Sequence, residues 1–152
     1  MADEIAVRRA NADDAEDVGR LLHDFNREFD EATPGPDFLA RRLSGLIASG
    51  EAVVLLAGAG PDGLAVLRSR PDLWSAGTVA YLEELYVVPE LRGRGIGRAL
   101  LDATVEAARR SRATRVEVGT DEGDTAARGL YESSGFTNRA DGELMFFYEL
   151  EL

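Results

Sequence analysis

Cysteine is absent from this chain of 152 residues, and the chain has a single histidine, His23. Disulfides, thiolate metal sites and a cysteine nucleophile are therefore excluded, and one histidine cannot build a histidine-rich metal cage. Long apolar runs are missing too, because the longest, Ala52–Ala57, is far shorter than a membrane-spanning helix. The acidic N-terminus lacks the basic-then-apolar pattern of a secretory signal, so the sequence predicts a cytoplasmic protein that does not enter a membrane.

Positive charge is scarce in this sequence. There are 17 Lys and Arg residues against 28 Asp and Glu residues, which gives a net charge of −11. Such a surface repels phosphate over most of its area, so no nucleic-acid partner is expected. Hydrophobic residues make up 45% of the chain, as in a folded globular protein. Neither a repeat nor a linker divides the sequence, so we predict a single domain over residues 1–152.

Hydrophobic periodicity predicts a mixed α/β fold. The expected order is a strand, two helices, three strands, a helix, a strand, a helix and a closing strand. Asn11 and Asp37 are expected to cap the first two helices, and Gly50 should follow the second. The expected strands cover Ile5–Arg9, Ala52–Ala57, Leu64–Arg70, Thr78–Val88, Arg115–Gly119 and Leu144–Leu150, and the later helices cover 93–110 and 125–133.

A turn rich in glycine and arginine joins the longest predicted strand to a helix. Its sequence is Arg92-Gly93-Arg94-Gly95-Ile96-Gly97-Arg98. Alternating glycines allow a tight turn that points free N–H groups and the positive helix end at one place, which favours a phosphate or pyrophosphate group. The arginines of the turn can attract a phosphate although the protein as a whole is acidic, since charges farther away than roughly 8 Å are largely screened by salt. P-loop, dinucleotide and kinase patterns do not match, because no lysine follows and Arg98 stands where a glycine is needed.

This turn matches [RQ]-x-x-G-x-[GA], the acyl-CoA signature of the GNAT superfamily of N-acetyltransferases. A second segment, Leu130-Tyr131-Glu132-Ser133-Ser134-Gly135-Phe136, resembles the other hallmark of that superfamily. The element order also fits, so the resemblance covers essentially the entire chain. It implies the GNAT fold, a single mixed and mostly antiparallel sheet flanked by helices. Residues 81–97 resemble the spermidine/spermine acetyltransferase branch most closely.

The resemblance implies acetyl-CoA as co-substrate and no metal. By the family pattern, the backbone of Leu85, Tyr86 and Val87 would pair with the pantetheine arm as an added strand. The N–H groups of the turn would hold the pyrophosphate, with Arg92, Gly93, Arg94, Gly95, Ile96, Gly97 and Arg98 as the binding segment. Asp124 stands where the family commonly has an asparagine that contacts the cofactor, and a carboxylate cannot donate the hydrogen bonds of an amide.

Acetyl transfer to an amine needs a base, because an alkylamine with a pKa of about 10.4 is mostly charged at neutral pH. Glu83, Glu84 and Glu117 are the candidate carboxylates. Strand alternation predicts that Glu83 and Glu84 lie on opposite faces, so that only one faces the acceptor. The resemblance favours Glu83 as the base, with Glu84 and Glu117 as substrate-binding residues. It also assigns the general acid to Tyr131, as a proton donor to the CoA thiolate.

An acidic stretch near the first inter-helix loop indicates the kind of acceptor. It comprises Glu28, Asp30, Glu31 and Asp37. Together with the net charge it favours a small cationic amine, while ordinary solubilising charge explains it equally well. Two other functions stay open: a protein N-terminal or lysine acetyltransferase, and a non-catalytic acyl-CoA-binding module. Members of the superfamily often form dimers, so a homodimer is a further expectation.

Overall fold

The computed structural model describes residues 4–152, which form two compact units. One extends to Val118 and the other covers Gly119–Leu152, and each is described by itself. The first unit contains a sheet and three α-helices in its described part. Its elements are β1 (Val7–Arg9), α1 (Ala15–Glu28), α2 (Pro36–Ala48), β2 (Val53–Ala57), β3 (Gly63–Pro71), β4 (Thr78–Val87), α3 (Ile96–Arg110) and β5 (Ala113–Val118), with short 3-10 turns at Ala12–Asp14 and Pro89–Leu91.

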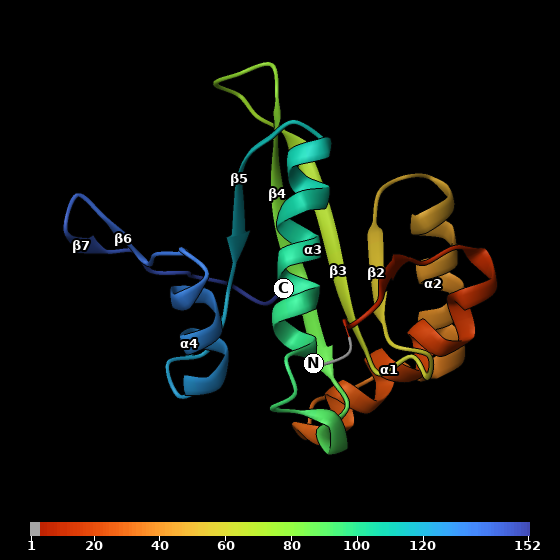
Figure 1. The fold of residues 1–152 in the computed structure, drawn as a ribbon. Coiled ribbons are helices and arrows are strands. Elements are labelled where there is room, and N and C mark those ends of the chain that lie inside the picture. Colours follow the sequence, from red (N-terminus) through yellow and green to blue (C-terminus); the bar gives the residue numbers. More distant parts are fainter. Residues whose placement is uncertain (1–3) are drawn as a thin grey trace. The chain divides into compact units, whose positions relative to one another are not determined.

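The five strands form one sheet in the order β1-β2-β3-β4-β5. Neighbouring strands are antiparallel except for β4 and β5, which are parallel, so the predicted mixed and mostly antiparallel sheet is confirmed. One hydrophobic cluster joins β2, β3 and β4 to α1 and α2, and another joins β3 and β4 to α3. The helices therefore cover both faces, and Figure 1 shows α3 on one face with its axis along β3 and β4.

The register between β3 and β4 shifts once, and this shift corrects the predicted faces of β4. Val66 lies opposite Glu84, whereas the next residue, Leu67, lies opposite Leu82, so Glu83 is the extra residue of a β-bulge. Strict alternation therefore fails at this point. Glu83 reaches Arg68 on β3, and Arg68 shares a face with Val66, so Glu83 and Glu84 lie on the same side of the sheet. The expectation that Glu83 and Glu84 lie on opposite faces of the sheet is therefore wrong.

The helix ends follow local sequence signals with one exception. Asn11 caps the Ala12–Asp14 turn that leads into α1, and its side chain accepts a hydrogen bond from the Asp13 N–H at 2.9 Å. Gly50 follows α2 with a φ of 77°, as expected of a residue after a helix end. Asp37 does not cap α2, however. The helix begins at Pro36, because proline suits the first helical position, and Gly35 is its N-cap.

The second unit, Gly119–Leu152, contains α4 (Thr125–Ser133), β6 (Arg139–Ala140) and β7 (Glu143–Leu144). The bounds of α4 are those that the sequence predicts. β6 and β7 form a short hairpin whose turn residues, Asp141 and Gly142, both have positive φ, as a tight hairpin turn requires. The predicted strand Leu144–Leu150 is wrong beyond Leu144, because the following residues have no strand partner in the described chain.

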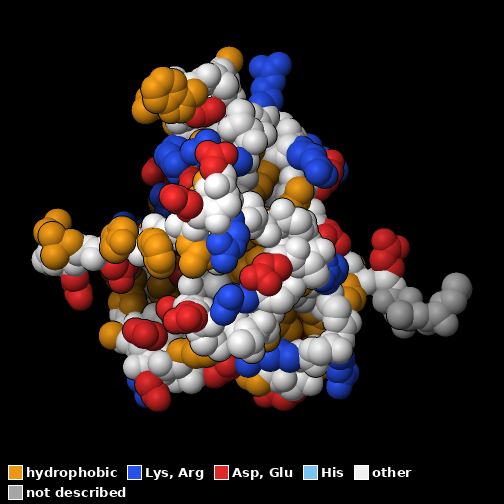
Figure 2. All heavy atoms as spheres, turned by 90° about the vertical axis from the view of Figure 1, so that its left-hand side faces the viewer, with side chains coloured by type: hydrophobic (Ala, Val, Ile, Leu, Met, Phe, Trp, Pro, Cys, Tyr) orange, Lys and Arg blue, Asp and Glu red, His pale blue; other side chains and the backbone are white. Residues whose placement is uncertain are grey.

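The surface carries mixed charges with hydrophobic side chains between them. Figure 2 shows orange clusters separated by acidic and basic groups on one side of the molecule. Within the first unit, the β3–β4 connection is the most exposed apolar point, with Leu73 and Trp74 91% and 89% exposed. Among residues 4–152, no helix is long and apolar enough to span a bilayer.

The contact between α1 and α2 depends on the absence of a side chain at Gly19. A methyl group added there would lie 2.5 Å from the Pro36 carbonyl oxygen and 2.7 Å from the Ala40 nitrogen, both of which are backbone atoms. We expect Gly19→Ala to lower the free energy of unfolding by about 2 kcal/mol, because the two helices must move apart. Urea denaturation monitored by circular dichroism measures the change.

Gly45 provides the matched control for this substitution. It is also an interior helical glycine, but a methyl group there meets no atom within 4 Å. Gly45→Ala should raise the free energy of unfolding by about 0.5–1 kcal/mol through helix propensity alone. Equal effects of the two substitutions would contradict the close approach of the helices.

Candidate functional site

The glycine-rich turn joins the end of β4 to the start of α3. Gly93 and Gly95 have φ values of 76° and 88°, a conformation that residues with a Cβ rarely adopt, and Gly95 is the N-cap of α3. No side chain caps this helix start, and the first helical hydrogen bond runs from Ala99 N–H to Gly95 O. The N–H groups of Ile96 and Gly97 therefore lack acceptors within the helix. This arrangement suits an anionic group such as the pyrophosphate of coenzyme A.

Beside this turn, the last residues of β4 have no strand partner on the β5 side within the part of the chain that the structure describes; we call this the unpaired edge of β4. The ladder with β5 ends where Leu82 meets Val118, but β4 continues to Val87, and Figure 1 shows β5 separating from it. The Val88 N–H donates to the Asp62 carbonyl at 2.9 Å on the β3 side. Because backbone groups alternate between the two sides of a strand, those of Leu85 and Val87 face the unpaired edge. The backbone of Tyr86 faces β3. An extended ligand could add to this edge as a strand.

Arg92 is held by other parts of the protein rather than extended into solvent. Its Nη1 lies 2.8 Å from Glu28 Oε2 and its Nη2 donates to Glu28 Oε1 at 2.9 Å, which makes a two-point ion pair with the last residue of α1. Its Nε donates to the Val87 carbonyl at 3.0 Å. Arg94 lies exposed between the two turn glycines, and Arg98 lies in the first turn of α3. The turn thus brings these arginines together, but they have different surroundings.

The three candidate carboxylates differ in their partners. Glu83 pairs with Arg68 at 3.3 Å, and Glu117 pairs with Arg70 at 2.8 Å, so both β4 and β5 carboxylates meet arginines of β3. No cation in the described chain pairs with Glu84. Burial, and to a lesser degree the negative charge of Glu83, raises the pKa of Glu84 to about 7. Among the three, Glu84 therefore has the protonation behaviour of a general base at neutral pH.

Two further predicted residues, Asp124 and Tyr131, belong to the second unit. Asp124 is the N-cap of α4, and its carboxylate accepts a hydrogen bond from the Ala127 N–H at 3.0 Å. This bond explains why an aspartate is suited to the position where the family commonly has asparagine. Tyr131 lies on α4, and its ring packs near Phe136 with the centroids 5.8 Å apart.

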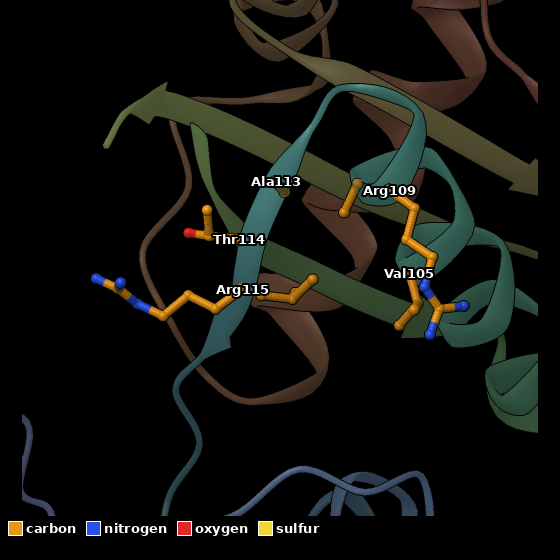
Figure 3. Close-up of a pocket in the computed structure, with 7 residues that line it drawn as sticks. Val105, Arg109, Ala113, Thr114 and Arg115 are labelled. Carbon is orange, nitrogen blue, oxygen red and sulfur yellow. The ribbon is translucent and has the colours of Figure 1, made fainter. Parts of the chain in front are cut away.

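A cavity of about 220 Å³ lies elsewhere, between the C-terminal half of α3 and β5. Figure 3 shows Arg109 on α3 and Arg115 on β5 pointing away from each other across it. Val105, Ala108, Ala113 and Val116 provide its apolar lining. Arg109, Thr114 and Arg115 complete the lining, so none of the residues around this cavity is a carboxylate or histidine that could act as a base. No group of three or more potential metal ligands gathers in residues 4–152 either.

Comparison with known proteins agrees with the class of protein that this geometry indicates, which is an acyl-CoA-binding acetyltransferase. The Acetyltransferase (GNAT) family matches residues 16–136. The chain belongs to this family, which uses acetyl-CoA. A crystal structure from Arthrobacter sp. FB24, designated an acetyltransferase, is 49% identical with a TM-score of 0.92 and covers 100% of this chain and 99% of its own. The GNAT fold predicted from the sequence is confirmed.

Two curated relatives have named acceptors. Aminoglycoside N(6′)-acetyltransferase type 1 of Klebsiella aerogenes is 36% identical over 108 residues, which cover 67% of this chain and 70% of that protein. Mycothiol acetyltransferase of Beutenbergia cavernae is 40% identical over 69 residues. That match covers 43% of this chain and only 23% of the relative, so the chain corresponds to a small part of the mycothiol enzyme.

The ion pairs of three residues that shape this site were not predicted from the sequence. Arg68 and Arg70 were expected only as strand residues, yet they pair with Glu83 and Glu117. Glu28 was expected as part of an acidic stretch near the acceptor, and its pairing with Arg92, 64 positions away in the sequence, was not predicted. Charge alternation along β3 gives a weak signal for the first two, since arginines at alternate positions share a face. No local pattern indicates the third.

The raised pKa of Glu84 can be measured directly. In ¹³C NMR titration its carboxyl group should change near pH 7 instead of near 4.5. Glu83→Gln should lower the pKa of Glu84, because it removes the neighbouring negative charge, but should leave it above the ordinary value, because burial is the larger cause.

Glu117→Gln is the matched control, since that carboxylate is not among the causes of the shift. It should leave the Glu84 titration in place. A wild-type titration near the ordinary glutamate value would contradict the assigned burial.

Proposed function

We propose that this GNAT family member transfers the acetyl group of acetyl-CoA directly to the primary amine of a small cationic molecule. The observation that carries the proposal is the edge of β4 beyond Leu82, which has no strand partner on the β5 side among residues 4–152 and leads to a helix start where the N–H groups of Ile96 and Gly97 lack helical acceptors. Such an edge suits the pantetheine arm, and the turn suits the pyrophosphate. The family match spans residues 16–136 and so crosses the boundary between the two units, which supports a single domain over residues 1–152.

Acetyl-CoA supplies the activated thioester, and residues of the chain bind it and move the proton. The N–H groups of Leu85 and Val87 are donors for carbonyl oxygens of the arm and of the acetyl group. Gly93–Arg98, with Arg94 and Arg98 as cations, bind the pyrophosphate. Asp124 acts through its cap on α4. Direct transfer fits a chain without cysteine, since no thiol is available to carry the acetyl group.

We infer that Glu84 is the general base, in place of the Glu83 favoured by the resemblance. Two observations support this exchange of roles. Glu83 and Glu117 each have an arginine partner that stabilises the charged carboxylate, whereas Glu84 has none in the described chain. In addition, a pKa of about 7 lets Glu84 accept a proton and release it again near neutral pH. Glu83 and Glu117 then hold the acceptor, and Tyr131 is the proton donor to the departing thiolate.

The choice of a cationic acceptor rests on charge and on similarity. Asp30, Glu31 and Asp37 lie exposed around the loop between α1 and α2, and the unpaired Glu84 adds a carboxylate near the β4 edge. The aminoglycoside relative and the local resemblance to the spermidine/spermine branch both point to polyamine-like acceptors. The expected homodimer and cytoplasmic location stay predictions.

A turnover assay with a panel of amines tests the proposed reaction. The chain has no cysteine, so a thiol reagent detects only the coenzyme A that is released. We expect polyamines and aminoglycosides to be acetylated with kcat/KM at least about tenfold above that of neutral amino acids, and added salt should raise the KM of the cations.

The other outcomes of the panel identify the alternatives. Preferential acetylation of peptide N-termini or lysine side chains would make this a protein acetyltransferase. Tight binding of coenzyme A without turnover of any amine would make it a non-catalytic acyl-CoA-binding module. Absence of coenzyme A binding would contradict the proposal entirely.

The pH dependence of kcat/KM tests the assigned base. Glu84 must be deprotonated to accept a proton, so activity should rise through about pH 7 and then level off. Glu84→Gln should remove this rise and lower the plateau by roughly a hundredfold or more. Glu83→Gln should keep the rise but move its midpoint to lower pH. The reverse pattern would restore the base role to Glu83.

The same profiles test the acid. Tyr131→Phe should lower kcat at every pH while leaving the midpoint near pH 7 unchanged, because Glu84 is intact. An unchanged kcat for a well-used acceptor would remove Tyr131 from the acid role.

A further inference from the structure

We propose that Arg92 and Glu28 are a positioning pair that holds the cofactor-binding edge of β4 in place, and that Arg92 is not itself a pyrophosphate ligand. The inference rests on the proposed binding of acetyl-CoA. It changes the expected role of Arg92 from binding the pyrophosphate to positioning β4. It also gives Glu28, the last residue of α1, a role as the partner of Arg92. The remaining turn residues then carry the pyrophosphate.

The contacts of Arg92 occupy its guanidinium from several sides. Both terminal nitrogens meet the Glu28 carboxylate, at 2.8 and 2.9 Å, and Nε meets the Val87 carbonyl. One face of the group lies over the Tyr86 ring, 5.5 Å from its centroid. A guanidinium with its fork and one face engaged has little capacity left for a phosphate.

Tyr86 connects this pair to the hydrophobic core. Its hydroxyl donates to Glu28 Oε1 at 3.3 Å, and its ring stacks on Phe25 of α1 with the centroids 4.8 Å apart. Burial and the nearby Glu28 charge raise the pKa of the Tyr86 phenol, which therefore stays a neutral donor. Glu28 thus accepts hydrogen bonds from two partners, and α1 is fixed to the end of β4.

The place of Val87 explains what the pair does for the cofactor. Val87 is the last residue of β4, and its carbonyl faces the unpaired edge, where Arg92 occupies it. The bond joins Val87 to Arg92, the residue before Gly93, and so closes the segment that leads away from the edge. It therefore holds the end of the edge, where the arm would bind, whereas the helix start, where the pyrophosphate would bind, is shaped by the backbone of Gly93 and Gly95.

Charge balance also opposes a ligand role for Arg92. The Glu28 side chain is only 26% exposed, so moving Arg92 to a phosphate would leave a partly buried carboxylate without its cation. Arg94 has no such tie within residues 4–152, and it lies exposed in the turn. An incoming pyrophosphate can recruit Arg94 without breaking an existing ion pair.

Fragments of the cofactor separate the two roles of an arginine. S-acetylpantetheine has the arm without any phosphate, and ADP has the pyrophosphate without the arm. We expect Arg92→Gln to weaken binding of coenzyme A and of S-acetylpantetheine by the same factor, about tenfold, and to change ADP binding by less than about twofold. Isothermal titration calorimetry measures all three.

Arg94→Gln is the matched control and should give the opposite pattern, with weaker binding of ADP and coenzyme A and unchanged binding of S-acetylpantetheine. Arg92→Lys should not restore binding, because an ammonium cannot contact Glu28 and Val87 together. Glu28→Gln should reproduce the Arg92→Gln pattern, and combining the two should add little, as expected for residues that act as one unit.

Two results would overturn the inference. The first is a loss of ADP binding in Arg92→Gln as large as the loss of coenzyme A binding, which would make Arg92 a direct phosphate ligand. The second is a Glu28→Gln variant that binds all three compounds like the wild type. Failure of the wild-type protein to bind coenzyme A is a different result, because it would contradict the proposed function itself.

Discussion

The site depends on one feature of β4, the extra residue at Glu83. Before it, β4 is paired on both sides, and after it only β3 remains as a partner, so a strand edge inside the sheet is left open. The same extra residue brings Glu83 to the side of the sheet that carries Glu84. Burial is the main cause that raises the pKa of Glu84, and the nearby Glu83 charge adds to it. The irregularity in β4 thus coincides with the open edge and contributes to the unusual protonation of Glu84.

Charge is distributed in this protein as pairs rather than as patches. All 17 basic side chains are arginines, against 28 acidic ones, and several of them bind carboxylates that would otherwise crowd the same region. Arg8 donates two hydrogen bonds to the Asp14 carboxylate, and Arg92 makes a similar two-point contact with Glu28. The planar fork of arginine makes such two-point contacts, which a lysine cannot make. At the glycine-rich turn, this pairing neutralises Glu28, the carboxylate that contacts Arg92.

The sequence predicted what local patterns encode. The bounds of α4, the cap at Asn11 and the glycine-rich start of α3 follow from residues close together in the chain, and two motifs placed it in its family. Contacts between distant residues were not predictable. The β4 bulge has no sequence signature of its own, because it is set by pairing with β3, and the Glu28–Arg92 pair joins residues 64 positions apart. The predicted closing strand Leu144–Leu150 was wrong beyond Leu144 for the same reason, because strand propensity in a segment does not determine whether another strand pairs with it.

Recognition of the cofactor and of the acceptor therefore draws on different parts of the molecule. The features suited to acetyl-CoA are backbone groups at the end of β4 and glycine conformations in the turn. The acceptor would instead meet the side chains of the α1–α2 loop and of the β3, β4 and β5 face. Relatives can thus share the first set and differ in the second, and the names of two relatives refer to different small molecules, an aminoglycoside and mycothiol. The Glu28–Arg92 ion pair joins the end of α1 to the segment that follows β4. Substitutions in the α1–α2 loop that move Glu28 should therefore also move the unpaired edge of β4, where the cofactor would bind.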